Sequence, residues 1–336
     1  MRGLSFVVGA AADRKEKGMQ ELRPRGRVLA ATVALVAVLA ACGRSAGVAH
    51  PAPATATTSV GFPVTITDDD GQRVTIPAPP RRIVTFAPSM TEIVYALGLG
   101  DRLVGVSGKY DNYPPAATSI TEVGGAGDFG VDPNIEKVVS LQPDLFLTIA
   151  GGDQWKQRLR ALGIRVVTFD ATGFLDLLND IRAIGRITGA AVAADRLAGG
   201  MQTAADAIQA KVANEPAVTC FFEAYYPPLT SVGPRTFIFD LLKRAGCDPV
   251  TAGAKSDYPD WSVDKLVQEG PAVYLVASES GVSAQAVAKR PGFGAIRAVA
   301  DGRVFLVSSD LVSRPGPRIV QGLEALAKDL HPAAMG

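Results

Sequence analysis

The chain has 336 residues, of which 47% are hydrophobic and 20% charged, a composition typical of a folded globular protein and long enough for two domains. Its 34 Lys and Arg residues nearly balance its 33 Asp and Glu residues, so no basic excess favours binding to a phosphate backbone. The two histidines, His50 and His331, lie near the chain ends, which argues against a zinc or haem-iron site built by the chain itself. We therefore expect no nucleic-acid partner, no metal site and no intrinsic cofactor.

Residues 1–41 have the pattern of a lipoprotein signal peptide. Segment 23–27 carries three arginines, and the mostly apolar run 28–41 follows and ends in Leu39-Ala40-Ala41-Cys42. Fourteen helical residues reach about 21 Å, short of the roughly 30 Å hydrocarbon core, so a permanent transmembrane span is the weaker interpretation. The small residues before Cys42 resemble those of bacterial lipoproteins. This implies cleavage after Ala41 and a lipid on Cys42, which would anchor the protein on the extracytoplasmic face of the cell membrane.

Two alternatives to this interpretation stay open. The cysteine could be incidental to an ordinary signal peptide, and Met19 could be the true start, because residues 1–18 form an unusually long lead. Residues 42–60 after the signal peptide contain mainly Ala, Thr, Pro, Gly and Ser, which bury too little apolar surface to order the chain. We interpret this stretch as a flexible tether.

Two cysteines, Cys220 and Cys247, remain once Cys42 is assigned to the lipid. An even pair in an exported protein is compatible with a disulfide. Two buried thiols are the equal alternative, because Cys220 lies in a strand-like apolar run and the sequence does not fix the distance between the two.

The folded part opens with a predicted hairpin, whose alternating runs 64–67 and 73–76 flank the turn residues Asp70-Gly71. A strand at 82–86 follows, and then Ser89-Met90-Thr91-Glu92, which has the pattern of a capping box that opens a helix. Short apolar strands continue to alternate with amphipathic helices along the chain. This alternation predicts an α/β protein with mostly parallel sheets.

The sequence also contains an internal repeat. Glu136 and Asp264 each lie seven positions before a proline, Pro143 and Pro271, and each proline is followed by an apolar strand and a further helix and strand. The repeat predicts two similar α/β lobes, over residues 61–171 and 215–336. Residues 172–214 between them have helical spacing with a break near Gly189, which predicts a stiff helical connection.

Residues 60–330 resemble the helix-hinged class of solute-binding proteins of ABC importers, which carry cobalamin, ferric siderophores or haem. The motifs that carry the resemblance are Arg82-Ile83-Val84 with Thr91-Glu92, Asp111 to Pro115, Pro143-Asp144-Leu145, Leu162 to Val166, and Ser309-Asp310 with Pro317-Arg318-Ile319. Within this class the chain looks most like the cobalamin-binding members. The resemblance implies a ligand cleft between the lobes, an ABC permease dimer with its ATPase as partners, and a monomeric binding protein.

A large planar chelate could contact aromatic side chains that stand among Gly, Pro and Asp residues, although each such side chain could instead belong to the core. The candidates are Tyr110, Phe129, Tyr225, Tyr226 and Tyr258. Gly151 and Gly152 would let the backbone approach the ligand closely. Asp310 would accept hydrogen bonds from ligand amides or would cap a helix. Arginines offer alternative anchors for anionic ligands: Arg235, Arg314 and Arg318.

The same resemblance assigns the repeated acidic residues, Glu136 and Asp264, to the contact with the permease dimer, one on each lobe. The alternative is a pair of solvated surface carboxylates. An enzymatic function is not expected, because the sequence has no Gly-x-Ser-x-Gly elbow, no phosphate-binding Gly-rich Lys loop and no His-Glu-x-x-His pair. A tethered sensor or adaptor with the same fold is the third possibility.

Overall fold

The computed structural model describes residues 61–124, 132–278 and 282–336, which belong to one compact unit. The predicted signal peptide, the lipidation site Cys42, the tether and the candidate ligand contact Phe129 all lie outside the described residues. Within these three ranges, no helix is long and apolar enough to cross a membrane.

The predicted hairpin is present as β1 (Val64–Thr67) and β2 (Arg73–Ile76), paired antiparallel with Val64 opposite Ile76. An aspartate in its turn contacts two residues outside the hairpin. Asp70 accepts a hydrogen bond from the buried Lys156 ammonium at 2.8 Å and from the Thr168 hydroxyl at 2.7 Å. The hairpin is therefore anchored to the neighbouring four-stranded sheet.

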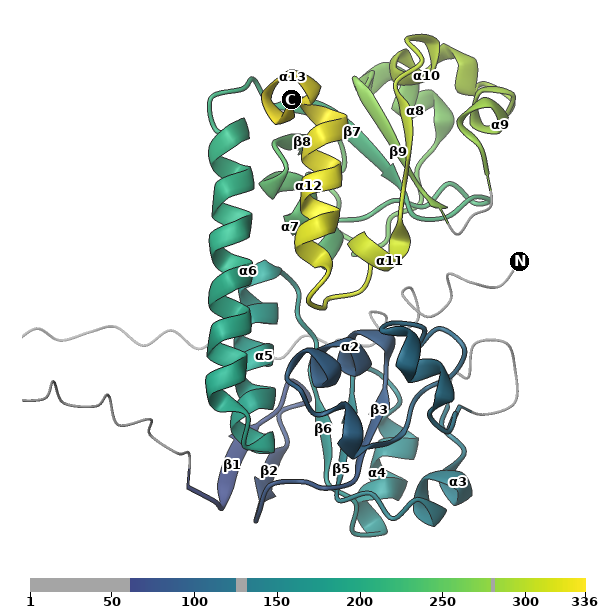
Figure 1. The fold of residues 1–336 in the computed structure, drawn as a ribbon. Coiled ribbons are helices and arrows are strands. Elements are labelled where there is room, and N and C mark those ends of the chain that lie inside the picture. The colour runs from purple at the N-terminus through teal and green to yellow at the C-terminus, as the bar shows by residue number, and fades with distance from the viewer. Residues whose placement is uncertain (1–60, 125–131, 279–281) are drawn as a thin grey trace, which may run out of the picture. The chain divides into compact units, whose positions relative to one another are not determined.

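Two four-stranded sheets, each wholly parallel, define the two lobes of the protein (Figure 1). Lobe 1 has the strand order β4-β3-β5-β6, with β3 (Ile83–Phe86), β4 (Leu103–Gly105), β5 (Leu145–Thr148) and β6 (Val166–Thr168). Lobe 2 has the equivalent order β10-β9-β7-β8, with β7 (Val218–Glu223), β8 (Cys247–Pro249), β9 (Val273–Ala277) and β10 (Val304–Val307). The predicted fold class, two similar α/β lobes with parallel sheets, is confirmed.

Helices surround these sheets. Those of lobe 1 are α2 (Pro88–Ala96), α3 (Ile135–Ser140) and α4 (Asp153–Ala161), with short 3-10 turns at Gly100–Arg102 and Pro115–Ser119. Those that follow β7 are α7 (Phe237–Arg244), α8 (Val263–Glu269), α9 (Ala284–Ala288), α10 (Arg297–Ala300), α11 (Ser309–Val312), α12 (Ile319–Leu330) and α13 (Pro332–Met335), with a 3-10 turn at Phe293–Ala295. The central strands β3, β5 and β9 are buried along their whole length, as expected for parallel sheets covered on both faces.

The connection between the lobes is a pair of packed helices, α5 (Phe174–Thr188) and α6 (Ala191–Val212). The predicted break is present at Gly189, which ends α5 in the left-handed conformation with φ 79°. The backbone N–H of Phe174 donates to Asp240 of α7 in lobe 2 at 2.8 Å. The other end of α5 contacts β1, and α6 packs against α12 and α13 (Figure 1). The α5 helix therefore touches elements on both sides of the connection, and α6 packs along it and on lobe 2.

One local prediction is wrong. The sequence Ser89 to Glu92 does not form a capping box, because α2 begins earlier, with Ala87 as its N-cap and Pro88 in its first turn. Proline fits the first helical position, where its missing N–H costs no hydrogen bond. Ser89 and Glu92 therefore lie inside the helix, and both are buried.

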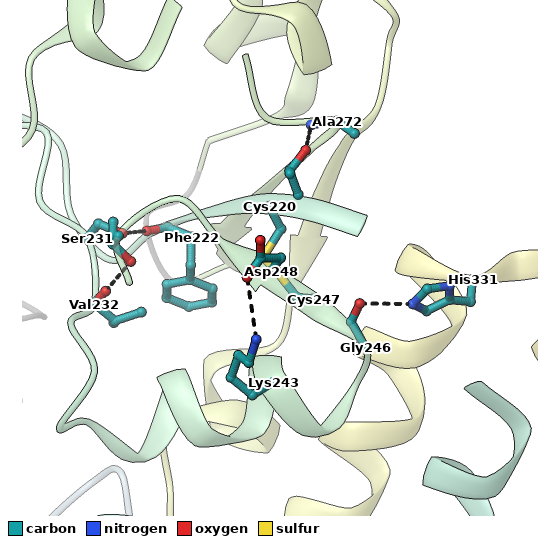
Figure 2. Close-up of a disulfide and its surroundings, with 12 residues drawn as sticks. Cys220, Phe222, Ser231, Val232, Lys243, Gly246, Cys247, Asp248, Ala272 and His331 are labelled. Carbon is teal, nitrogen blue, oxygen red and sulfur yellow. Dashed lines mark hydrogen bonds and ion pairs between the residues drawn. A yellow bond between two sulfur atoms is a disulfide. The ribbon is translucent and has the colours of Figure 1, made fainter. Parts of the chain in front are cut away.

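A disulfide between Cys220 and Cys247 joins β7 to β8 in the structure (Figure 2). Of the two interpretations left open by the sequence, the structure has the bonded one. Both cysteines are buried, and β7 and β8 are also paired through their backbones, with Val218 opposite Cys247. The bond therefore links two strands of one sheet within lobe 2.

Candidate functional site

The predicted ligand contacts follow the carboxyl ends of parallel strands in both lobes. Tyr110 follows β4, Gly151 and Gly152 follow β5, Tyr225 and Tyr226 follow β7, and Asp310 and Arg314 follow β10. Loops at this edge of a parallel sheet are where α/β proteins bind ligands, near the point where the strand order reverses. In both lobes the order reverses at the central pair, β3 with β5 and β7 with β9.

Arg314 of lobe 2 reaches loop 107–113 of lobe 1. Its Nη1 donates to the backbone oxygen of Tyr110 at 3.0 Å and to Oδ1 of Asn112 at 3.1 Å. Its Nη2 forms an ion pair with Asp310, one helical turn earlier, at 2.5 Å. The structure thus brings together three of the predicted contacts: Tyr110, Asp310 and Arg314. We call the contact of segments 89–92 and 107–113 with segment 310–318 the interlobe junction.

Asp310 is not the helix cap that the sequence offered as an alternative. The N-cap of α11 is Ser308, and Asp310 is the second residue of the helix. Its carboxylate points to Arg314 instead, because residues four apart lie on the same face of a helical segment.

A second arginine crosses the interlobe junction. Arg318 donates from Nε to one oxygen of Glu92 at 2.9 Å and from Nη2 to the other at 2.5 Å. Its guanidinium also lies 4.0 Å from the ring centroid of Tyr113. The Glu92 side chain is 2% exposed, so this is a buried bidentate pair between residues 226 positions apart.

Within the lobe 1 part of the junction, Asp111 is a buried carboxylate. It accepts hydrogen bonds from the hydroxyls of Thr91 and Ser107 and from the backbone N–H of Gly108. Burial raises the pKa of Asp111, while these hydrogen bonds and the positive charge of Arg314 act in the opposite direction. Asp111 fixes the loop that carries Tyr110, which is itself 36% exposed.

The other predicted tyrosines differ in their surroundings. Tyr258 packs against the main core, and its pKa is raised first by burial and then by the negative charges of Asp257 and Asp170. Tyr226 packs edge-to-face on Phe293 of lobe 2 and carries the Arg290 guanidinium on its ring, 4.1 Å from the centroid. Tyr225 forms an isolated backbone bridge with Thr230. These contacts of Tyr225 and Tyr226 are made within lobe 2.

Gly151 and Gly152 both have positive φ, 87° and 76°. A Cβ on Gly152 would overlap the indole of Trp155, which packs on Phe86 and Phe146. The need for glycine at position 152 therefore has a structural cause inside lobe 1, independent of any ligand.

The repeated acidic residues, Glu136 and Asp264, occupy equivalent positions. Each is the second residue of a short helix and is exposed. Each helix begins with a side-chain cap that accepts from the backbone N–H three residues on, Asn134 in α3 and Ser262 in α8. Among the described residues neither carboxylate has an ion pair.

Sequence reasoning missed Glu92 as part of the site and treated Arg318 only as a ligand anchor. The available signal was the composition of α2, in which Glu92 is the only charged residue among nine. A lone carboxylate on a buried helix face needs a cationic partner.

The described ranges hold a cavity near the junction and no metal site. A small cavity beside loop 107–113 is lined by lobe 1 residues alone, Asp111 and Glu122 among them, and so it does not lie between the lobes. No group of His, Cys, Asp and Glu in these ranges could hold a metal ion.

Comparison with known proteins identifies the family. The model of a family described as periplasmic binding protein matches residues 83–311. A protein of Bacillus subtilis, named "Uncharacterized ABC transporter substrate-binding lipoprotein YvrC", is 36% identical over 324 residues, which cover 93% of this chain and 98% of that protein. A "Cobalamin-binding protein" of Halobacterium salinarum is 32% identical over 325 residues, 91% of this chain and 85% of that protein.

The fold comparison agrees. The crystal structure of the periplasmic vitamin B12 binding protein BtuF of Vibrio cholerae matches with a TM-score of 0.68 at 24% identity, over 76% of this chain and 99% of that one. With equivalent parallel sheets in two lobes and a family match over most of the folded part, the chain belongs to the periplasmic binding protein family.

Proposed function

We propose that this protein is the substrate-binding component of an ABC importer, and that it captures a large metal chelate between its lobes. The observation that carries the proposal is the interlobe junction, where loops from the carboxyl edges of both sheets meet at Tyr110, Asp310 and Arg314. The relatives named as a substrate-binding lipoprotein and as a cobalamin-binding protein support it. A corrinoid is the first candidate ligand, and a ferric siderophore or haem is the second.

Calorimetry with cyanocobalamin, a ferric siderophore and haem tests the ligand. The exposed Tyr110 ring would stack on a corrin, so Tyr110→Ala should weaken cobalamin binding by about 1 to 3 kcal/mol, roughly 5- to 150-fold. Leu162→Ala is the control, because Leu162 is 57% exposed on lobe 1 and no site is assigned to it. Tight siderophore binding without heat from cobalamin would reverse the ranking of ligands, and binding of none of the three would contradict the proposal.

The permease contact is the second part of the proposal. Glu136 and Asp264 would present one negative charge from each lobe to arginines of a permease dimer. The double variant Glu136→Lys, Asp264→Lys should lose uptake and keep ligand affinity, because like charges at an interface repel while the junction residues are unchanged. The control is Glu324→Lys, at an exposed position on α12. Normal uptake by the double variant, or loss of ligand binding, would return the two carboxylates to the solvated-surface interpretation.

The membrane anchor is the third part. A lipid on Cys42 would hold the protein at the extracytoplasmic face, and residues 42–60 would give it reach. Cys42→Ser should release the protein or leave its signal peptide uncleaved, which membrane fractionation and mass spectrometry detect. Retention of a full-size mature variant in the membrane fraction would refute the anchor.

A further inference from the structure

The arginines of the interlobe junction already have carboxylate partners within the protein. Arg314 makes its ion pair with Asp310 at 2.5 Å and gives Nη1 to two oxygens of lobe 1. Arg318 is paired with both oxygens of Glu92. The side chains of Arg314 and Arg318 are only 14% and 15% exposed. Neither is set up to receive a ligand carboxylate.

The same internal pairing occurs at two other predicted ligand contacts. In lobe 2, Arg235 forms an ion pair with Asp257 at 2.8 Å, beside Tyr258. Arg290, stacked on Tyr226, is bound to both oxygens of the buried Glu223 at 2.6 and 3.0 Å. Each of these two arginines has its own carboxylate, at a position adjacent to a predicted ligand contact.

Further carboxylates stand beside the predicted ligand contacts. In lobe 1, Lys109 lies 5.3 Å from the ring centroid of Tyr110, and the buried carboxylate of Asp111 stands two residues away in the same loop. Near Tyr258, Asp170 joins Asp257 as a second source of negative charge. An anionic ligand placed here would meet carboxylates next to every arginine named above, at distances where charges inside a protein interact strongly.

From this pairing we infer that the site selects metal chelates without net negative charge, and that Asp310 is a specificity-determining residue because it neutralises Arg314. The inference rests on the proposed function. Uncharged or cationic chelates with amide-bearing rims suit the site, since amide N–H groups donate to carboxylates and flat apolar surfaces pack on tyrosine rings. Chelates with free carboxylates or catecholate oxygens do not suit it, because they need unpaired cations.

The test uses four probes and three proteins. The probes are cyanocobalamin and a neutral ferric tris-hydroxamate on one side, and haemin and a ferric tris-catecholate, both anionic, on the other. The proteins are the wild type, Asp310→Asn and Asp301→Asn. Asp301 is the matched control, because it also pairs with an arginine four positions away, Arg297, but on an exposed surface of lobe 2 where both side chains are more than half exposed.

The wild type should bind at least one of the two uncharged probes at least 100-fold more tightly than either anionic probe. Asp310→Asn leaves the Arg314 charge without its partner, so the ratio of anionic to uncharged affinity should rise about tenfold and become sensitive to salt. The same ratio in Asp301→Asn should stay within twofold of the wild type. Whichever of cyanocobalamin and the tris-hydroxamate the wild type binds more tightly identifies the class of uncharged chelate that is the ligand.

The outcomes distinguish a failure of the charge selection from a failure of the proposed function. Tight wild-type binding of an anionic probe, or an unchanged ratio in folded Asp310→Asn, overturns the charge selection and leaves the proposed function intact. Binding of none of the four probes by the folded wild type overturns both. If Asp310→Asn does not fold, the wild-type panel decides the charge selection by itself.

Discussion

Removing the arginine that joins Glu92 across the lobes should destabilise the protein strongly. In Arg318→Ala the Glu92 carboxylate, 2% exposed, would stay buried without its bidentate partner. Breaking a buried ion pair costs about 3 to 5 kcal/mol, and because Arg318 is 15% exposed we expect a value near the lower end, about 3 kcal/mol. Loss of the contact with the half-exposed Tyr113 ring adds roughly 0.5 kcal/mol. For this total of about 3.5 kcal/mol, the midpoint of thermal unfolding should fall by roughly 7 to 14 °C.

Thermal unfolding followed by circular dichroism, without ligand, measures this change. The control is Arg297→Ala, which removes an exposed pair with a 3.6 Å separation and should shift the midpoint by less than about 2 °C. The double variant Glu92→Gln, Arg318→Met should recover more than half of the loss, because no buried charge then lacks a partner. A shift for Arg318→Ala no larger than the control's, or a double variant no better than the single one, would refute the reasoning.

Three further predictions concern stability. Gly152→Ala should lower the unfolding free energy by at least about 1 to 3 kcal/mol, because φ is 76° and the new Cβ overlaps Trp155. The control Gly302→Ala, at φ 67° with free space around it, should lose only the free energy of backbone strain. Equal shifts of the melting temperature in the two variants would contradict this prediction. Reduction of the Cys220–Cys247 disulfide, whose cysteines are 27 residues apart, should lower the free energy of unfolding in guanidinium by about 3.5 kcal/mol. Identical unfolding curves with and without reductant would argue against the bond. Asp180 is buried near Asp69, Asp176 and Asp170, and burial raises its pKa to about 8. A raised carboxyl pKa means that the folded state holds the proton more tightly than the unfolded state, so stability should fall as the pH rises from about 4 to 8. Asp180→Asn should reduce that fall in melting temperatures measured across this pH range. An unchanged pH profile in the variant would show that Asp180 does not cause the fall.

The fold was largely predictable because its determinants are local. The repeat that placed Glu136 and Asp264 seven residues before a proline corresponds to two helices with the same kind of side-chain cap, the same position of the acidic residue and the same burial pattern over their first four residues. The hairpin and the break at Gly189 also depend on neighbouring residues, a turn dipeptide in one case and a left-handed glycine in the other.

The site was less predictable because its pairing is not local. Ser89 and Glu92 have the spacing of a capping box, but Pro88 begins the helix and Glu92 pairs with Arg318 far along the chain. Likewise, the sequence offered Arg314 as a ligand anchor and Asp310 as a cap, and only the structure shows them bound to each other. Local patterns identify which residue types are present, whereas the partner of a buried charge depends on how the lobes meet.

When the chain emerges with its N-terminus first, the segments that build the two lobes emerge at different times. The strands of the lobe 1 sheet all lie between Ile83 and Thr168, so that sheet can assemble while the rest of the chain is still being delivered. Lobe 2 must wait for β10 and for α12, which packs back on α6 and α7. Arg318 lies in one of the last segments to emerge. The Glu92–Arg318 pair therefore forms after the lobe 1 sheet can already have assembled. Until then, Glu92 on the first lobe lacks its cationic partner.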